Sequence, residues 1–248
     1  MPALQPSPAS RRLLRNVDLF QDLEDNDLEA VARVGRYRQL EEDEFLYYQG
    51  DPATHLYAVL AGSLKLVQID PEGHQVLLRY ARPGEVFAIL AVLGGMPFPT
   101  SAQAVEASQV MGWDHDSMKN LMLRYPGIAM RALEVLVQHT REFQDRIREL
   151  STERVERRIA RAVLRLARQS GRKVPEGILI DLPVSRQDLA EMSGTTLFTV
   201  SRTLSQWESQ GIVKSGREKI VILFPHGLVT IAEDLPFKLN EDHFPDFE

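Results

Sequence analysis

A strict helical repeat runs through the middle of the chain. Its members are separated by 4, 3, 4, 3, 4 and 3 residues and are Ala129, Leu133, Leu136, Thr140, Phe143, Ile147 and Leu150. This is the a/d pattern of a coiled coil held over three heptads, and such a seam usually meets a second copy of itself. We therefore predict a dimerisation helix at residues 127–150 and a homodimer joined through Leu133, Leu136, Thr140, Phe143, Ile147 and Leu150. Packing of this helix on its own chain is the alternative.

The pattern before this helix is that of a β-protein. From about Glu41 to Trp113, short apolar runs alternate with the turn signals "QGDP" (49–52), "AGS" (61–63), "DPEG" (70–73), "RPGE" (82–85) and "GGMPFP" (94–99). Short strands at such spacing predict an antiparallel sandwich or barrel. Residues 10–35 are predicted to form short helices. We assign residues 1–126 to a β-roll (jelly-roll) domain, so the fold class is α+β.

A second domain is predicted at residues 151–225. Ser151 or Thr152 is expected to cap a new helix, followed by a loop at 169–177 and a strand at 178–183. Two short helices and a hairpin at 212–223, turning at Ser215–Gly216, complete it. Residues 226–248 are predicted to be an acidic C-terminal tail, poorly ordered from 235 onward.

The two short helices carry the spacing of a helix–turn–helix. Ser185 can cap the first helix with Asp188 three residues later, and Gly194 permits the left-handed turn that ends it. Thr196 can cap the second helix, in which Val200 faces inward. The hairpin that follows makes the module a winged helix–turn–helix.

Such a module places its second helix, here 196–210, in the major groove of DNA. Arg202 can donate two hydrogen bonds to a guanine, while Leu197 and Phe198 offer only apolar contacts, for example to thymine methyl groups. Charged and hydroxyl side chains nearby are candidates for phosphate contacts. The predicted DNA-binding residues are Ser185, Arg186, Thr196, Leu197, Phe198, Thr199, Ser201, Arg202, Lys214 and Arg217.

Charge and composition agree with this assignment. The net charge is −6, yet residues 152–225 hold 13 Lys and Arg against 8 Asp and Glu, so a basic segment lies between acidic ones. The chain has no cysteine, which excludes disulfides and cysteine-bound zinc or iron–sulfur clusters. With neither an apolar membrane span nor a signal peptide, we expect a cytoplasmic protein with no membrane partner.

The order of short helices, β-roll, heptad helix and winged helix–turn–helix resembles one family of bacterial regulators. It includes the cyclic-AMP receptor protein and the fumarate–nitrate reduction regulator (the Crp-Fnr family). The segments that carry the resemblance are "LFQDLEDNDLEAVA", "YQGDPATHLYAVLAGSLKL", "PGEVFAILAVL" and "SRQDLAEMSGTTLFTVSRTLSQWESQGIV". The resemblance implies a homodimeric transcription regulator that binds a palindromic promoter site in double-stranded DNA and works with RNA polymerase. It also implies an effector pocket in the roll beside the dimer helix.

Several positions depart from the family pattern. Members that bind cyclic nucleotides have a ribose-binding glutamate where this chain has Ile89, and an Arg-Ser pair where it has Thr100 and Ser101. A buried phosphate would lack its charged partners here, which argues against cyclic AMP. We therefore expect a different small-molecule effector in a pocket formed by Phe87, Ile89, Leu90, Thr100 and Ser101, or a packed core without ligand. Phe198 stands where the family usually has a glutamate, whereas Ser201 and Arg202 match the fumarate–nitrate group.

Other functions stay open from the sequence alone. A haem-dependent sensor of nitric oxide or carbon monoxide could use His55, His74 or His139, and a ligand-independent regulator needs no cofactor. A metal enzyme built on the roll would need a cluster of inward ligands, and only His55 and His74 lie in the roll. No metal site and no catalytic residue are predicted. A regulatory subunit that binds a protein through the roll would have no use for the basic winged module.

Overall fold

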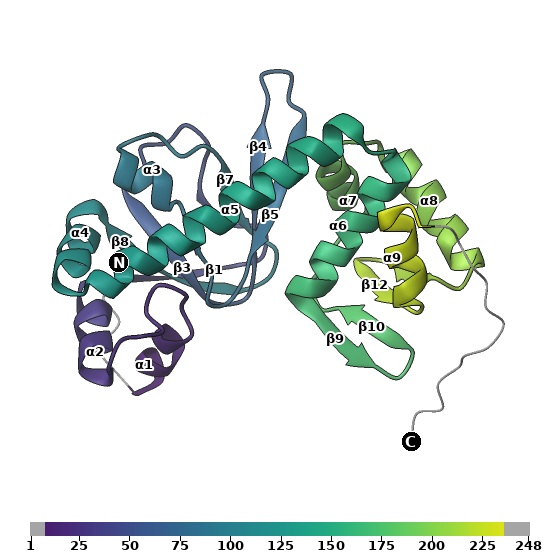
Figure 1. Ribbon diagram of the computed structural model, residues 1–248. Coiled ribbons are helices and arrows are strands. Elements are labelled where there is room, and N and C mark those ends of the chain that lie inside the picture. The colour runs from purple at the N-terminus through teal and green to yellow at the C-terminus, as the bar shows by residue number, and fades with distance from the viewer. Residues whose placement is uncertain (1–7, 236–248) are drawn as a thin grey trace. The chain divides into compact units, whose positions relative to one another are not determined.

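The computed structural model describes residues 8–235, with side chains from residue 12 onward. The chain forms two compact units, Met1–Arg146 and Ile147–Glu248, which are described separately. One helix, α5 (Pro126–Thr152), runs from the first unit into the second (Figure 1). Residues 236–248, for which the sequence predicts poor order, lie outside the described part of the chain.

The first unit is a β-roll with short helices before and after its strands. Its elements before α5 are α1 (Pro8–Arg15), α2 (Asp25–Val34), β1 (Arg36–Leu40), β2 (Phe45–Tyr47), β3 (His55–Ala61), β4 (Leu64–Ile69), β5 (Gln75–Ala81), β6 (Val86–Phe87), α3 (Ile89–Gly94), β7 (Ser101–Ala104), β8 (Ser108–Asp114) and α4 (His115–Arg124). The strands form two four-stranded antiparallel sheets, in the orders β1-β8-β3-β6 and β2-β7-β4-β5. The predicted β-roll is confirmed, although its first strand begins at Arg36, before the predicted start.

The two sheets enclose one hydrophobic core. Val59 and Val110 of one sheet and Leu64 and Ala102 of the other belong to the same buried cluster. Burial of these alternate side chains is the main stabilising term of a sandwich. The turn signals in the sequence mark the ends of the strands because each strand must reverse to keep its apolar face inside.

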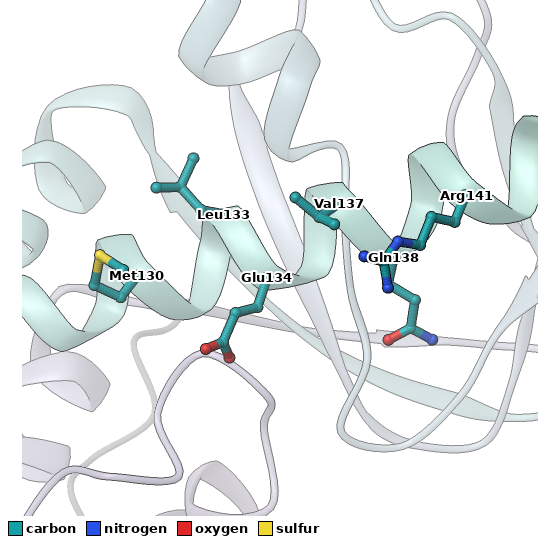
Figure 2. Close-up of a pocket in the computed structure, with 6 residues that line it drawn as sticks. All are labelled: Met130, Leu133, Glu134, Val137, Gln138 and Arg141. Atoms are coloured by element: carbon teal, nitrogen blue, oxygen red, sulfur yellow. The ribbon is translucent and has the colours of Figure 1, made fainter.

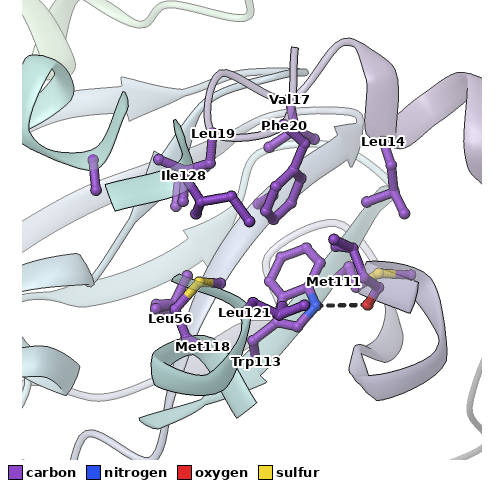
Figure 3. Close-up of a cluster of buried hydrophobic side chains, with 14 of the residues drawn as sticks. Leu14, Val17, Leu19, Phe20, Leu56, Met111, Trp113, Met118, Leu121 and Ile128 are labelled. Atoms are coloured by element: carbon purple, nitrogen blue, oxygen red, sulfur yellow. Dashed lines mark hydrogen bonds between the residues drawn. The ribbon is translucent and has the colours of Figure 1, made fainter. Parts of the chain in front are cut away.

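A second core joins the helices to the outer side of the first sheet (Figure 3). The rings of Phe20 and Trp113 meet edge to face, with centroids 5.1 Å apart. The indole N–H of Trp113 donates to the carbonyl of Val31 at 3.0 Å, which satisfies a polar group that would otherwise be buried unpaired. Val135 and Leu136 pack against this cluster, so the first half of α5 is held on the roll.

The second unit contains a small sheet and further helices. Its elements after α5 are α6 (Val155–Ser170), β9 (Gly171–Val174), β10 (Gly177–Ile180), α7 (Arg186–Ser193), α8 (Leu197–Ser209), β11 (Val213–Gly216), β12 (Lys219–Ile222) and α9 (Pro225–Glu233). The sheet has the strand order β11-β12-β10-β9. Ile159, Val163 and Leu166 of α6 are buried, as expected from its apolar stripe.

Two predicted features of this unit are wrong. The loop expected at 169–177 contains β9, because Gly171–Val174 pairs with Gly177–Ile180. The second hairpin turns at Arg217–Glu218 and not at Ser215–Gly216, since Ser215 pairs with Ile220 inside the ladder. Glu218, the second residue of this turn, has a positive φ of 54°.

The helix boundaries also differ at both ends of this unit. Ser151 and Thr152 do not cap α6: their hydroxyls donate to the carbonyls of Ile147 and Arg148 at 2.8 Å, inside the last turns of α5. The prediction that a tail begins at residue 226 is also wrong for the first residues of that segment. Residues 225–233 form α9, whose buried Leu228 and Ala232 lie on the side that packs on α6.

Candidate nucleic-acid interface

The turn between α7 and α8 has the geometry that the sequence predicts. Ser185 and Asp188 form a reciprocal capping box at the start of α7. Gly194 ends the helix in the left-handed conformation, with φ of 56° and ψ of 48°, where a side chain is disfavoured. The hydroxyl of Thr196 accepts from the backbone N–H of Thr199 at 3.2 Å and caps α8. These local interactions fix the angle between the two helices.

The two sides of α8 differ in burial. Val200, Leu204 and Trp207 are fully buried and hold the helix to its unit. The opposite side is open: Phe198 is 76% exposed, Leu197 is 48% exposed, and Arg202 is exposed. Ser201 and Thr199 are half-buried at the edge. The first turns of α8 therefore present two apolar side chains and one guanidinium to the outside, with two hydroxyl groups at the edge.

Arg158 on α6 fastens the turn from behind, a role that sequence reasoning missed. Its guanidinium donates to the carbonyls of Ser193 at 2.9 Å and Gly194 at 3.1 Å. A third bond runs to the carbonyl of Glu153 at 3.2 Å. The only signal in the sequence is a cation near the start of an amphipathic helix, and nothing local indicates that its partner lies 35 residues away. Arg158 thereby stabilises the carbonyl end of α7, which a glycine turn leaves unpaired.

A second network joins the hairpin to α8. The carboxylate of Glu208 accepts from the backbone N–H of Ser215 at 2.7 Å and from its hydroxyl at 2.6 Å. These bonds lower the pKa of Glu208 below its ordinary value, the side-chain bond first. Arg186 donates to the same hydroxyl at 3.0 Å. The wing β11–β12 is thus fixed relative to α8, and Arg186, predicted as a phosphate contact, takes part in this network.

The remaining basic candidates are free at the surface. Lys214 and Arg217 are exposed, and neither side chain has an ion pair or hydrogen bond to another described residue. The same holds for Arg202 within residues 12–235. Cations that stabilise a fold are normally paired, as Arg158 is, whereas cations that bind phosphate or bases must stay available.

In the roll, the residues predicted to form an effector pocket differ in burial. Phe87, Ile89, Thr100 and Ser101 are buried, whereas Leu90 is 61% exposed on α3, and the pocket stays a prediction. The exposure of Leu90 follows from its helical position, because Ile89 and Val92 occupy the inner side of α3.

Two buried hydroxyl groups of this region, those of Thr100 and Ser101, already have partners. The Ser101 hydroxyl accepts from the backbone N–H of Gln49 at 2.9 Å, and Thr100 is hydrogen-bonded to the phenol of Tyr47. The ring of Tyr47 stacks on Phe98 with centroids 3.7 Å apart, and burial raises its pKa. The ring of Phe87 lies 6.3 Å from that of Tyr47, centroid to centroid, and all three rings belong to the buried cluster between the sheets.

The histidines considered as haem ligands lie in unlike surroundings. His74 is exposed at the β4–β5 turn, 2.9 Å from the Asp70 carboxylate. His55 and His139 are half-buried, and burial followed by the charge of Arg79 lowers the pKa of His139 to about 4. Among the described side chains, one group has metal-ligand spacing, and it is the exposed Asp70, Glu72 and His74.

Along α5, the predicted dimer residues are mostly exposed. Leu133 is 56% and Phe143 57% exposed, and Thr140, Ile147 and Leu150 are also open. Leu136 is partly buried against the core of the roll. Beside Leu133, the helix carries an open groove (Figure 2) whose lining residues are Met130, Leu133, Glu134, Val137, Gln138 and Arg141. The single chain leaves this apolar face uncovered, and the dimer contact stays a prediction.

Comparisons with known proteins agree with both units. Residues 37–125 match the cyclic nucleotide-binding domain, and residues 157–231 match the Crp-like helix-turn-helix domain. The transcriptional activator protein Anr of Pseudomonas protegens is 28% identical over 218 residues, 86% of this chain and 87% of that protein. The cyclic AMP receptor protein of Thermus thermophilus is 27% identical over 203 residues, 82% of this chain and 91% of that protein.

A solved structure shares the fold. FixK2 from Bradyrhizobium japonicum superposes with a TM-score of 0.71 at 26% identity and covers 80% of this chain and 97% of its own. Within residues 8–235, no helix is both long and apolar enough to cross a lipid bilayer. The cyclic nucleotide-binding type of roll, the long helix and the Crp-like helix–turn–helix occur here in one chain and in one order. The chain therefore belongs to the CRP/FNR family of DNA-binding transcription regulators.

Proposed function

We propose that the protein acts in the cytoplasm as a homodimer that binds a palindromic promoter site, with one α8 in the major groove of each half. The observation that carries the proposal is the free outer side of α8, where Arg202 is exposed and unpaired among the described residues. Its guanidinium matches the O6 and N7 acceptors of a guanine. Lys214 and Arg217 on the wing would contact phosphates and set the register. RNA polymerase is the expected protein partner.

Selection of DNA sites from a random library by the full-length protein tests this proposal. We expect an inverted repeat whose half-sites lie about 34 Å apart, one turn of the duplex. In the Arg202→Ala variant, preference for one guanine per half-site should fall by about 1–3 kcal/mol. Lys214→Ala is the matched control, since it also removes an exposed cation. It should weaken binding to all sequences alike and reduce the salt dependence. An unchanged selected site in Arg202→Ala would contradict the proposal.

The dimer part of the proposal has its own test. Leu133 lies on the open face of α5, and replacing it by glutamate would bury a charge in the predicted seam. Leu123 of α4, 72% exposed, lies outside that seam and provides the control. By sedimentation equilibrium we expect a dimer for the wild type and Leu123→Glu, and a monomer for Leu133→Glu. A monomeric wild type would refute the seam.

For regulation through the roll, we propose an effector other than cyclic AMP. One observation favours a second candidate, a ligand-independent regulator: the Tyr47 side chain stacks on Phe98 and is hydrogen-bonded to Thr100, in the region predicted to bind the effector. Both candidates predict that the protein binds its selected site equally well with and without added cyclic AMP, and tighter binding with cyclic AMP would contradict both. Absence of haem absorption from the purified protein would remove the gas-sensor alternative. A haem band would instead require a different assignment of the roll.

A further inference from the structure

The apolar side chains at the start of α8 are exposed without a structural reason. Val200, Leu204 and Trp207 complete the inner side of the helix, and neither Leu197 nor Phe198 adds to it. Phe198 is the most exposed large apolar side chain among the described residues, at 76%. A phenyl ring left in water gains free energy when a partner covers it. Its position on α8 indicates what that partner is.

Phe198 and Arg202 lie four residues apart and therefore on the same side of α8. Four residues rise about 6 Å along the helix axis. The spacing of stacked bases along one strand is about 3.4 Å. If Arg202 contacts a guanine, the Phe198 ring therefore lies one to two base pairs from it, over the edges of bases in the same groove.

The chemistry of the groove restricts what a phenyl ring can recognise there. It has no hydrogen-bond donor or acceptor, and the apolar group on the major-groove edge of a standard base pair is the C5-methyl of thymine. Against the amino group of cytosine or the acceptors of guanine, the ring would exclude water without replacing its hydrogen bonds. A methyl group suffers no such loss.

We propose that Phe198 is a specificity-determining residue that recognises a pyrimidine C5-methyl group one to two base pairs from the guanine contacted by Arg202. Leu197, 48% exposed on the neighbouring side of the helix, borders the same contact. This inference rests on the proposed function, since it requires α8 to lie in the major groove. Thymine and 5-methylcytosine both carry the group, so the experiment includes both.

The test replaces each thymine of the selected site in turn by deoxyuridine, which removes only the methyl group. We expect one position per half-site at which affinity falls about fourfold, the effect of exposing one methyl-sized group. Replacing both half-sites should lower affinity by about fifteenfold. At that position, cytosine should bind weakly and 5-methylcytosine should recover part of the affinity.

Two variants connect the effect to the ring. Phe198→Ala should bind the thymine and deoxyuridine sites equally well. Phe224→Ala provides the matched control, since Phe224 is also an exposed phenylalanine of this unit, at 45%, but lies outside α8. It should keep the thymine preference. Equal binding of thymine and deoxyuridine sites by the wild type, with the Arg202 effect intact, would overturn this inference alone. Loss of any selected site, with no Arg202 effect, would instead show that the proposed function is wrong.

Discussion

In the β-roll, Thr100 and Ser101 are buried and already hydrogen-bonded, whereas on α8 Arg202 is exposed and has no partner among the described residues. Aromatic side chains show the same contrast: Phe98 stacks on Tyr47, and Phe198 is open to solvent. A surface that awaits a ligand keeps its groups available, because a group that is already paired gains little from a new partner. The comparison supports the proposals that α8 binds DNA and that the interior of the roll is a packed core.

Removal of the Phe98 ring should have the largest effect on the free energy of unfolding. Phe98 is 3% exposed, so Phe98→Ala should lower the free energy of unfolding of the roll by about 3–5 kcal/mol. Tyr48→Ala, at an exposed aromatic of the neighbouring segment, should change it by less than about 0.5 kcal/mol. Chemical denaturation measures both. A small effect at Phe98 would mean that the interior is not packed around this ring and has room for a ligand.

The next test concerns Arg158, whose guanidinium stabilises the turn that precedes α8. Arg158→Met removes hydrogen bonds to the carbonyls of Ser193 and Gly194 and should destabilise the second unit by about 2–3 kcal/mol. Arg154→Met, four residues earlier and exposed, is the control and should be nearly neutral. Denaturation followed by Trp207 fluorescence reports on this unit. Equal stability of the two variants would show that the hydrogen bonds of Arg158 do not stabilise the second unit.

A third test uses pH on the side of α5 that faces the roll. Burial, and then the charge of Arg79, lower the pKa of His139 from 6.5 to about 4 in the folded chain. The unfolded chain therefore binds a proton first as the pH falls. The stability associated with the neutral ring is complete above about pH 6.5 and is lost as the pH falls toward 4, with about 2 kcal/mol lost between pH 7 and pH 5. His139→Gln should lack this component in denaturation curves at pH 7 and pH 5. The same slope in both proteins would contradict the burial of the ring.

The smallest test concerns the backbone before α3. Ala88 adopts a left-handed conformation, with φ of 63°, that disfavours a side chain by about 1–2 kcal/mol. Ala88→Gly relieves this strain but loosens the unfolded chain, so we expect a net gain of about 0.5–1 kcal/mol. Ala91→Gly, inside α3 and without a positive φ, should be destabilising by about 1 kcal/mol. A thermal melt that shows loss of stability in both variants would argue against strain at Ala88.

Much of the architecture could be predicted because its determinants are local. The capping box at Ser185, the left-handed Gly194 and the cap at Thr196 lie within a few residues of the backbone they control, and the structure confirms each of them. The strands of the roll follow the turn signals in the same way. Some local signals led to wrong predictions. Ser151 was expected to cap α6, but its hydroxyl donates to the carbonyl of Ile147 inside α5.

The sequence by itself determined the β-roll, the long helix and the helix–turn–helix, since periodicity and turn chemistry act between neighbours along the chain. The tertiary structure alone decided which charges are paired and which remain free. Arg158 and Glu208 are tied to Ser193 and Ser215, while Arg202 and Lys214 stay open. It also showed that the rings of Tyr47 and Phe98 are buried and stacked on each other in the core of the roll. These contacts join residues that the fold brings together, and the free energy of each depends on burial that no local pattern of residues records.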